Sequence, residues 1–535
     1  MKNKIRIAVF CNNYKIDYCN HSMLEEVLQN PQIEVVNFFV NQRLEHKSSY
    51  LFSQHKRFEE QIFKIHPNAQ EKKKLENLIP ESKIIRIDNQ QSSAEIRSFI
   101  KEQNLDYIIK LDHPILENSF EKIVSGGILF LYHGNLKSPI TNIPGAREML
   151  TNQDFMEANL MFLSNESELN VLKTIKVSAD KMSIIRGTNN LLWAASKLIP
   201  RALQGFLANG HNNYLKKANM VTDFNVEDTS NIWKLKDREL AASLIKKYSK
   251  KINQLIYSRI HTAQWMLLYT FKPYNPIESS PKNFTKIMPP KDRFWADPFI
   301  YRRDNQYYVF FEELVYNDIK GHISVMALNE DGTYTQPKCI LKKEYHLSYP
   351  FLIEDNNELY MIPETKENKT IEIYRCVEFP YEWEFEMNLK SNIAAVDTTI
   401  LKKDNRYWMF TNIQERKGAS VNNELFIFYS NNLLSQNWHP HLENPVVSDV
   451  SKARSAGNIF EFKNELYRPA QNCSKHYGYA MSINRITNLT EEKYEEEEVS
   501  IILPNWDRNI TSTHTFNQLN NLSVIDGEMQ IKKEL

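Results

Sequence analysis

The apolar positions of the first 135 residues alternate between short continuous runs and segments with helical spacing. Residues 22–28 and 93–102 show the three- and four-residue spacing of amphipathic helices. Strand-length apolar runs lie around them at residues 5–10, 33–40, 83–87, 107–111 and 127–133. Alternating strands and helices predict a doubly wound parallel α/β sheet, in which a site lies at the carboxyl ends of the strands. His133 ends the last of these runs.

The middle of the chain has a different pattern, which indicates helices. Residues 190–203 are amphipathic, and residues 237–257 have helical spacing with basic residues on one side. We interpret residues 176–260 as a helical connector and its basic residues as a solvated face. Residues 272–290 are rich in Pro, Ser and Asn, which predicts a linker or a surface loop.

The second half repeats one order of features: an acidic residue at a strand edge, a polar turn, then an aromatic strand. The strand clusters fall at residues 293–340, 345–390, 394–440, 453–497 and 498–535. Such repetition predicts an all-β, five-bladed β-propeller over residues 261–535. Propellers often close their ring with strands from both ends of the domain. We therefore expect residues 262–271 to pair with residues 522–527.

Composition narrows the range of functions. Lys plus Arg and Asp plus Glu both number 66, so the net charge of zero gives no electrostatic reason to expect nucleic acid or an anionic membrane. The five cysteines are odd in number and widely spread, which indicates a reducing compartment and no zinc or other metal site. No run reaches the roughly 20 apolar residues of a membrane span. Residues 1–10 look like a first strand rather than a signal peptide. We expect a cytoplasmic protein without a transmembrane segment.

Residues 1–175 resemble the formyltransferase fold shared by methionyl-tRNA formyltransferase and the sugar N-formyltransferases. The matching pieces are residues 105–109, 115–116, 127–133 and 144–147. The resemblance implies transfer of a formyl group from 10-formyltetrahydrofolate to an amine. His133 matches the catalytic His of the family. Leu131 stands where the family has an Asn that stabilises the oxyanion, and Leu cannot donate a hydrogen bond. Two alternatives stay open. If the domain is active, Asn135 takes the role of that Asn. If it is not, the domain has lost formyltransferase activity and binds a ligand or another domain instead.

The second half resembles the N-terminal domain of plant glucosamine inositolphosphorylceramide transferase and its bacterial relatives. The resemblance implies a sugar-related context. It rests on residues 296–299, 310–312, 320–323, 346–350, 361–365, 396–399, 467–471 and 514–515.

A more distant resemblance is to the five-bladed glycosidases of the arabinanase and invertase type. It places Asp297 as a base in an early blade, with Glu364 and Asp397 in equivalent positions of later blades. Hydrolysis or transfer at a glycosidic bond needs one protonated and one ionised carboxyl, and three inward acids could supply them. The same acids could instead bind sugar hydroxyls, or they could form turns and staple the blades. Further candidate ligand-binding residues are Glu312, His346, Arg454, Arg468, Gln471 and His514.

Three functions stay open from the sequence. The first is a transferase of surface-glycan biosynthesis, of the formyl- or glycosyltransferase type, with a sugar nucleotide or glycan intermediate as substrate. The second is a non-catalytic protein whose propeller holds a glycan for a partner enzyme. The third is a glycosidase-like propeller. The sequence does not give the sugar or the oligomeric state.

Overall fold

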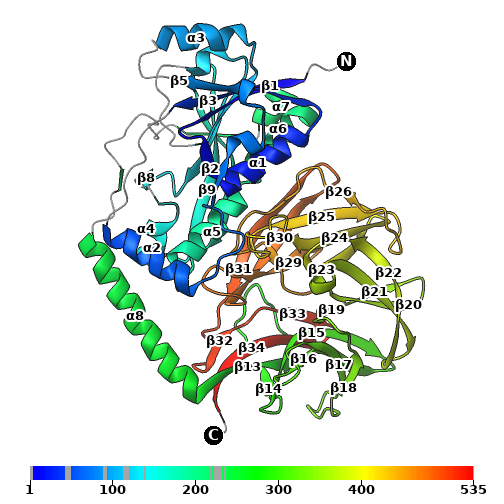
Figure 1. Ribbon diagram of the computed structural model, residues 1–535. Helices are drawn as coiled ribbons and strands as arrows, with labels where there is room; N and C mark the ends of the chain where they lie inside the picture. Colours follow the sequence, from blue (N-terminus) through cyan, green and yellow to red (C-terminus); the bar gives the residue numbers. More distant parts are fainter. Residues whose placement is uncertain are drawn as a thin grey trace. The chain divides into compact units, whose positions relative to one another are not determined.

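The computed structural model describes residues 4–41, 50–87, 93–111, 120–137, 140–141, 143–216, 218–221, 232–233 and 237–533. The chain forms two compact units (Figure 1). The first comprises Met1–Ser249 together with Arg416–Ser420, and the second comprises Lys250–Glu415 together with Val421–Leu535.

An eight-stranded mixed sheet forms the centre of the first unit. Its strand order is β11-β10-β9-β7-β6-β1-β3-β5. The strands are β1 (Ile5–Cys11), β3 (Ile33–Asn41), β5 (Ile84–Ile87), β6 (Tyr107–Lys110), β7 (Gly127–His133), β9 (Phe155–Ser164), β10 (Leu169–Ser178) and β11 (Asn219–Met220). The short strands β2 (Lys15–Asp17), β4 (Lys72–Lys74), β8 (Ile140–Thr141) and β12 (Ile232–Trp233) pair outside it. The predicted β-α-β opening is confirmed by the parallel pair of β1 and β3 around α1 (Tyr18–Gln29).

The parallel sheet predicted from the sequence is only partly correct. Strands β5, β3, β1, β6 and β7 are parallel, whereas β9, β10 and β11 are antiparallel to their neighbours. For β9 and β10 the reason is the short turn between them, because a connection of a few residues can join only antiparallel strands.

The helices after β10 pack into the core of the first unit. α5 (Ile184–Ala195) and α6 (Leu198–Asn209) bury their apolar faces in the same cluster as side chains of β1, β7, β9 and β10. The sequence assigned these helices to a separate connector; their buried apolar residues make them part of the first unit instead. The other helices are α2 (Tyr50–Ile62), α3 (Ser93–Glu102), α4 (Ala146–Leu150), α7 (His211–Leu215) and α8 (Asp237–Ile260). No described helix is long and apolar enough to cross a membrane.

Five sheets form the second unit, which confirms the predicted five-bladed propeller. The first four blades, in chain order, are β15–β18 (Arg293–Arg303, Gln306–Val315, His322–Leu328, Lys338–Leu341), β19–β22 (Ser348–Asp355, Glu358–Glu364, Thr370–Glu378, Glu382–Ser391), β23–β26 (Ala395–Lys403, Arg406–Ile413, Leu425–Ser430, His439–Pro440) and β27–β31 (Arg454–Ser455, Phe460–Phe462, Glu465–Asn472, Ala480–Leu489, Tyr494–Ile502). The predicted strand clusters coincide with these blades to within a few residues.

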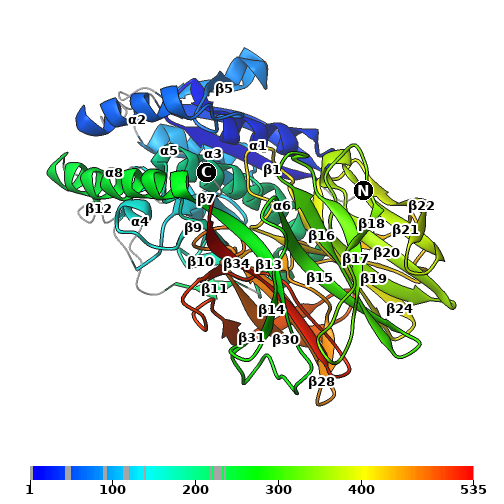
Figure 2. The same cartoon turned by 90° about the horizontal axis from the view of Figure 1, so that it is seen from below.

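The fifth blade is built from both ends of the propeller sequence. Its strands are β13 (His261–Thr270), β14 (Thr285–Ile287), β32 (Ile510–Ser512), β33 (Phe516–Leu519) and β34 (Leu522–Lys532). β13 and β34 run side by side as an antiparallel pair from His261↔Lys532 to Thr270↔Ser523 (Figure 2). The predicted pairing of residues 262–271 with residues 522–527 is therefore confirmed.

Each blade turns from its first to its second long strand through residues with a left-handed backbone. The residues with positive φ at these turns are Asp304, Asn305, Asn356, Asn357, Asp404, Asn405, Lys463, Asn464 and Asn520. Two-residue hairpins need positive φ because only that turn matches the twist of the strands, and Asn and Asp tolerate it best. The polar turns seen in the sequence thus have one physical cause in all five blades.

Tyr349 links the second blade to the third and the fourth. Its side chain is fully buried, and its ring packs edge-on against Phe299. The Tyr349 hydroxyl accepts a hydrogen bond of 2.7 Å from the backbone N–H of Gly457 and lies 2.8 Å from the Thr399 hydroxyl. Replacing the hydroxyl leaves buried backbone groups without a partner, which is costly.

We therefore expect Tyr349→Phe to lower the free energy of unfolding of the propeller by about 1–3 kcal/mol. Urea unfolding followed by tryptophan fluorescence measures this change. Tyr334→Phe is the matched control, because Tyr334 is 41% exposed. Equal midpoints for the two variants would show that the contacts of the Tyr349 hydroxyl do not stabilise the ring.

Candidate functional site

Bulges in the first strands of three blades place the candidate residues. The register of pairing shifts between Ala296 and Phe299, between Ser348 and Phe351, and between Val396 and Thr399. Each bulge contains a non-glycine residue with positive φ: 52° at Asp297, 47° at Tyr349 and 50° at Asp397. A bulge bends its strand and re-aims a side chain, and such strained residues cluster at functional sites. Asp297 and Asp397 therefore occupy equivalent places in the first and third blades.

Asp297 is held by two other blades. Its carboxylate accepts hydrogen bonds from the Thr515 hydroxyl at 2.7 Å and from the Tyr349 backbone N–H at 3.2 Å. His514 Nε2 lies 3.5 Å from the same carboxylate. Only 3% of Asp297 is exposed, and burial raises its pKa to about 6, against the lowering effect of His514. Both carboxylate oxygens are thus engaged within the protein.

Asp526 fixes this arrangement from the composite blade. It is fully buried and accepts hydrogen bonds from the backbone N–H groups of His514, Thr515 and Asp297. Its carboxylate also lies 2.6 Å from His514 Nδ1, and the carboxylates of Asp526 and Asp297 help raise the pKa of His514 to about 9 against its burial. Asp297, His514 and Asp526 are close enough together to suggest metal ligands. Their oxygens are already occupied by N–H and O–H donors, so the trio acts as a hydrogen-bonded junction between blades.

Arg454 binds two acids of different blades. Its Nε donates to Asp397 Oδ2 at 2.6 Å, and its Nη2 donates to Asp397 Oδ1 at 3.1 Å. Nη2 also lies 3.5 Å from Glu364 Oε2. Gln471 Nε2 donates a further hydrogen bond of 2.8 Å to Asp397. Asp397 is therefore a buried carboxylate whose negative charge is compensated by a bidentate guanidinium.

Glu364 differs from Asp397 in its charge state. Burial is the main cause that raises its pKa to about 8, and the neighbouring Asp397 adds to the effect more than Arg454 offsets it. Glu364 is then protonated at neutral pH, and it lies beside Asp397, which pairs with Arg454. Two carboxyls with different protonation are what acid–base chemistry at a sugar requires.

Glu312 lies near the same carboxyls and pairs with His346. Burial, then the charges of Asp297 and Glu364, raise the pKa of Glu312 well above its ordinary value. His346 Nε2 lies 3.3 Å from Glu312, while His346 Nδ1 accepts a hydrogen bond of 2.9 Å from the Gly321 backbone N–H. That bond fixes the neutral tautomer with its proton on Nε2, directed at Glu312. We call Asp297, Glu312, Glu364, Asp397 and Asp526 the acid cluster.

Two aromatic rings lie beside the acid cluster. Arg454 stacks at 4.9 Å over the ring of Tyr477, which is 47% exposed. The His514 ring lies 5.4 Å from Tyr477 and 4.3 Å from Trp265. Aromatic rings offer flat apolar faces against which the C–H face of a sugar ring can pack.

No sequence pattern pointed to Trp265, Tyr477 or Asp526. Trp265 lies in β13, at the other end of the domain from the rest of its blade. Tyr477 lies between β29 and β30, and no repeat marks it. For Trp265 and Asp526 there was one usable signal, because the predicted pairing of residues 262–271 with 522–527 places them in one blade.

Arg468 is not brought to the acid cluster. It is 1% exposed and pairs with Glu496 at 2.7 Å and with the carbonyl of Lys452 at 2.6 Å. These contacts join β29 to the outermost strand of the fourth blade, β31, and to the segment before β27. The suggestion that Arg468 binds substrate is therefore not supported by its contacts, whereas Gln471, three residues along β29, does contact Asp397.

His133 and Asn135 belong to the first unit. His133 ends β7 as predicted; its Nε2 is buried without a hydrogen-bond partner, and burial lowers its pKa to about 4. Asn135 is exposed, and its side chain accepts a hydrogen bond from the Lys137 backbone N–H. Leu131 packs against the core of the sheet. The side chain of Asn135 is thus engaged in a local turn and not in a pair with His133.

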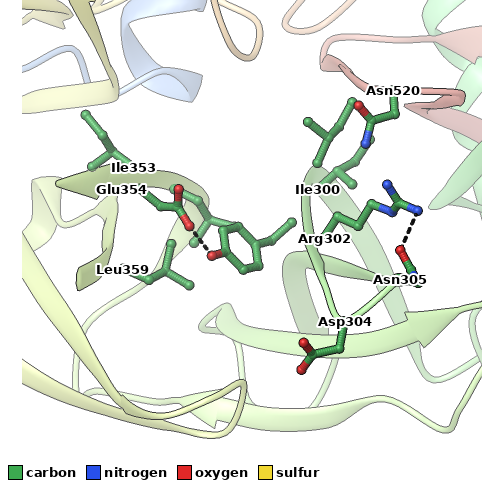
Figure 3. Close-up of a pocket in the computed structure, with 11 residues that line it drawn as sticks. Ile300, Arg302, Asp304, Asn305, Ile353, Glu354, Leu359 and Asn520 are labelled. Atoms are coloured by element: carbon green, nitrogen blue, oxygen red, sulfur yellow. Dashed lines mark hydrogen bonds between the residues drawn. The ribbon is translucent and has the colours of Figure 1, made fainter. Parts of the chain in front are cut away.

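A separate pocket lies towards the turn end of the first two blades (Figure 3). It has a volume of about 490 Å³ and is lined by residues from β15, β19 and β20 and from the turn after β33. Tyr301 hydrogen-bonds to Glu354, and Arg302 donates to Asn305 at 3.1 Å. None of the predicted acids lines this pocket, and its charged side chains are mostly engaged with their neighbours.

Comparison with known proteins concerns the propeller. Residues 274–526 match the family model described as glucosamine inositolphosphorylceramide transferase 1, N-terminal. This part of the chain is therefore similar to that N-terminal domain. Glucosamine inositolphosphorylceramide transferase 1 of Oryza sativa subsp. japonica is 37% identical over 211 residues, and that of Arabidopsis thaliana is 35% identical over 213 residues. In both cases the match covers 39% of this chain and 28% of the relative.

Solved structures show a much weaker likeness. A family 117 glycoside hydrolase from the marine bacterium Zobellia galactanivorans has a TM-score of 0.33 at 10% identity, over 50% of this chain and 90% of its own. The catalytic domain of a GH62 α-L-arabinofuranosidase from Coprinopsis cinerea also has a TM-score of 0.33 at 10% identity, over 44% and 90% of the two chains. The five-bladed topology is established by the strand pairing itself, and these likenesses add nothing to the site.

The acid cluster predicts a pH dependence of stability. Between about pH 5 and pH 8, Glu364 keeps a proton in the folded protein that the unfolded chain has released, so stability falls as the pH rises. His514 acts in the same direction, because its raised pKa gives stability that is complete below about pH 6.5 and is lost as the pH rises through about 9. Below about pH 6.5 the lowered pKa of His133 acts in the opposite direction, so we expect the free energy of unfolding to fall from about pH 6.5 to pH 9, by up to about 1.4 kcal/mol per pH unit for each proton involved.

Glu364→Gln tests the share of Glu364, because Gln imitates the protonated acid at every pH. The variant should show a shallower decline than the wild type between about pH 5 and pH 8 in urea unfolding measured at a series of pH values. Glu358→Gln, at the exposed start of the same strand, is the control and should leave the slope unchanged. Parallel curves for Glu364→Gln and the wild type would show that Glu364 is ionised in the folded protein.

Proposed function

We propose that the acid cluster and the neighbouring rings of Tyr477 and Trp265 bind a saccharide, and that the chain acts as a transferase in glycan biosynthesis. The similarity of residues 274–526 to the N-terminal domain of glucosamine inositolphosphorylceramide transferase supports a glycan context. The matched region spans 28% of those relatives, so their activity as whole proteins enters here as part of the proposal.

The observation that carries the proposal is the difference between Glu364 and Asp397. Asp397 forms an ion pair with Arg454, while burial and the neighbouring Asp397 keep Glu364 protonated. In a glycosyl transfer, the Glu364 proton would pass to the leaving oxygen as the bond between that oxygen and the anomeric carbon breaks. The acceptor hydroxyl passes its own proton to solvent as its oxygen forms the new bond to the anomeric carbon. A neutral carboxyl is the required donor, because an ionised one has no proton to give.

The charge balance of the cluster favours a sugar that carries an amine. With protons retained on Glu312 and Glu364, the carboxylates of Asp297, Asp397 and Asp526 face two well-placed cations, Arg454 and His514, among the residues named in the site. The donors of Arg454 are engaged by Asp397, Glu364 and Asn422, so an anionic ligand gains little from it. An ammonium group would compensate the excess negative charge instead. An amino sugar also agrees with the glucosamine in the name of the relatives.

A second function, glycan binding without turnover, is favoured by the state of Asp297. Both oxygens of its carboxylate accept hydrogen bonds within the protein, and the residue is almost fully buried. In this second function, Asp297 joins neighbouring blades through hydrogen bonds and does not act as the base that the glycosidase resemblance implies. A propeller with this arrangement could present a saccharide to a partner enzyme.

Ligand titration and turnover measurements on the full chain separate these functions. We expect saturable calorimetric binding of glucosamine that is stronger than that of glucose or N-acetylglucosamine, which lack the charge. With an alkyl glucosaminide as donor, whose alkoxide leaving group needs a proton, transfer to a second sugar should fall by roughly 10²–10⁴-fold in Glu364→Gln while binding is retained. Glu358→Gln should match the wild type in both measurements.

Each other outcome has a definite reading. Binding with no turnover in the wild type supports the glycan-holding function. Cleavage of aryl glycosides without transfer supports the glycosidase reading. No saturable binding of any of these saccharides contradicts the proposal as a whole.

Formyl transfer by the first unit remains a prediction from its resemblance to the formyltransferases. In its favour, His133 lies at the carboxyl end of β7 with an unpartnered Nε2, and its lowered pKa keeps it neutral at physiological pH. Leu131 supplies no donor for an oxyanion, and Asn135 bonds to its own turn. Fluorescence titration with a formyl-folate analogue tests this directly. An active domain should bind it saturably and lose that binding in His133→Ala, and the absence of binding in the wild type excludes the reaction.

A further inference from the structure

A pocket in the first unit is lined neither by His133 nor by any residue of the acid cluster. It lies between α2, the loop of residues 63–70 that follows α2, and the first turns of α5, and its volume is about 360 Å³. α2 and α5 lie side by side in this unit (Figure 1). Pockets that bind small molecules begin at about 300 Å³, so the space is large enough for a ligand.

The pocket lies at the carboxyl ends of the parallel strands. In the loop, the backbone carbonyl of Ala69 accepts a hydrogen bond of 3.1 Å from the N–H of Cys19, at the start of α1, which follows β1. α5 follows β10, and β10 runs parallel to β7 because both are antiparallel to β9. Ligands of open α/β sheets bind at this edge. The position of the pocket in the fold is therefore typical of a ligand site.

Three side-chain amides of the lining use their oxygens inside the protein. Asn189 Oδ1 accepts a hydrogen bond of 2.7 Å from the Ala69 backbone N–H. Asn68 Oδ1 accepts one of 3.0 Å from the Gln70 N–H, and Gln70 Oε1 accepts one of 3.1 Å from Lys56 Nζ. Backbone N–H and ammonium groups can only donate, so these bonds fix which amide atom is the oxygen. Each amide therefore has its NH₂ group left for a ligand.

Two lysines add to these donors. Lys56 uses one of its three N–H bonds on Gln70, and Lys64 makes no hydrogen bond or ion pair in the described part of the chain. Glu60 is the one acid of the lining; it is exposed and pairs with neither lysine. The side chains thus offer five donor groups against one acceptor group, and two positive charges against one negative charge.

Glu59 occupies the N-terminus of α5 and leaves the pocket to the side chains. Its carboxylate accepts hydrogen bonds from the Ser183 hydroxyl at 2.9 Å and from the Ile185 backbone N–H at 3.0 Å. The charge of Glu59 is therefore compensated inside the protein, and the free N–H groups of the helix end are used. A ligand in the pocket is held by the amides and lysines instead.

The rest of the lining is apolar. Phe63, Ile65 and Ile185 line the pocket together with the donor groups, and Phe63 and Ile65 are partly exposed. A purely inorganic ion would leave this apolar surface in water. A ligand that combines acceptor oxygens with an apolar body would cover it and gain its transfer free energy.

We propose that this pocket binds a small organic phosphate. The phosphate accepts hydrogen bonds from Lys56, Lys64 and the three amides, and the apolar body packs against Phe63 and Ile65. A phosphate monoester has three terminal oxygens and a charge near −2, which matches two ammonium groups. A carboxylate fits less well, because it has two oxygens and a single charge for five donor groups. The site is independent of saccharide binding in the propeller.

Calorimetric titration of the full chain tests the proposal. The probes are phenyl phosphate, glucose 6-phosphate, inorganic phosphate and benzyl alcohol. We expect phenyl phosphate to bind saturably and most tightly, glucose 6-phosphate and inorganic phosphate more weakly because they do not cover the apolar surface, and benzyl alcohol not at all. Binding of phenyl phosphate should weaken as salt is added, because the lysines are near the surface.

Asn68→Asp tests the arrangement of donors. The Asp keeps the acceptor for the Gln70 N–H but replaces the NH₂ group with a negative oxygen, so we expect the affinity for phenyl phosphate to fall by roughly tenfold or more. Asn30→Asp is the matched control. Asn30 Oδ1 accepts the same kind of bond, 3.0 Å from the Gln32 N–H, at the opposite edge of the sheet, and this variant should bind like the wild type.

Two charge variants complete the test. Lys64→Gln should weaken binding by roughly threefold or more, with Lys101→Gln, an exposed lysine of α3, as its control. Glu60→Gln should strengthen binding by roughly threefold, because it removes the one negative charge of the lining. A gain of affinity cannot come from damage to the fold.

The outcomes that overturn the proposal are specific. They are an absence of saturable binding of phenyl phosphate to the wild type, and benzyl alcohol that binds as tightly as phenyl phosphate. Equal affinity of the wild type and Asn68→Asp would place the phosphate elsewhere on the chain and also overturn it. Glucose 6-phosphate that binds more tightly than phenyl phosphate would contradict the assignment of the apolar surface to the ligand body.

Discussion

The propeller's centre depends on one buried ion pair, between Arg454 and Asp397. Burying several carboxyls together is expensive, and it is tolerated only where a charge is compensated or a proton is retained. Arg454 compensates Asp397 directly with two N–H···O contacts. Glu364 then responds to the burial and to the fixed charge of Asp397 by keeping its proton. Burial and the neighbouring Asp397 thus keep a proton on Glu364, while Arg454 pairs directly with Asp397.

The bulges in the first strands of three blades place the polar side chains that this ion pair and its neighbours need. Asp297, Tyr349 and Asp397 have positive φ at equivalent places in consecutive blades. In an unbroken strand, side chains alternate strictly between the two faces. The extra residue in each bulge lets one polar side chain leave that alternation. The surrounding blades hold the strained residues in place through Thr515, Gly457 and Gln471.

Much of the propeller could be predicted from the sequence because its repeat has a physical cause. Polar turns with positive φ recur once per blade, and aromatic residues follow them in the second strands of the first four blades. The closing pair of β13 and β34 follows from the need to leave no open edge. The acids Glu364 and Asp397 could be found because they stand at fixed places in that repeat. The role of Arg468 could not be predicted, because the sequence pattern of a strand is the same whether its arginine binds a ligand or bonds to neighbouring strands.

In the first unit, less of the structure could be predicted from the sequence. Its β-α-β opening and His133 at the end of β7 were predictable, because apolar runs of strand length are distinctive. The antiparallel strands β9 to β11 were not, because an apolar run does not show its direction. Tyr477 and Trp265 were missed for a related reason. Their role depends on which strands and loops meet in three dimensions, and no local pattern records that.

The composite blade has a consequence for how the protein forms during synthesis. His261 pairs with Lys532, so the first propeller strand to leave the ribosome waits for nearly the last one. Until β34 emerges, the edge of β13 that pairs with it is open to the cell. Such edges can pair with other chains, and long-range pairing is slow. Every protein molecule therefore passes through an open-ring stage whose length is set by the rate of translation.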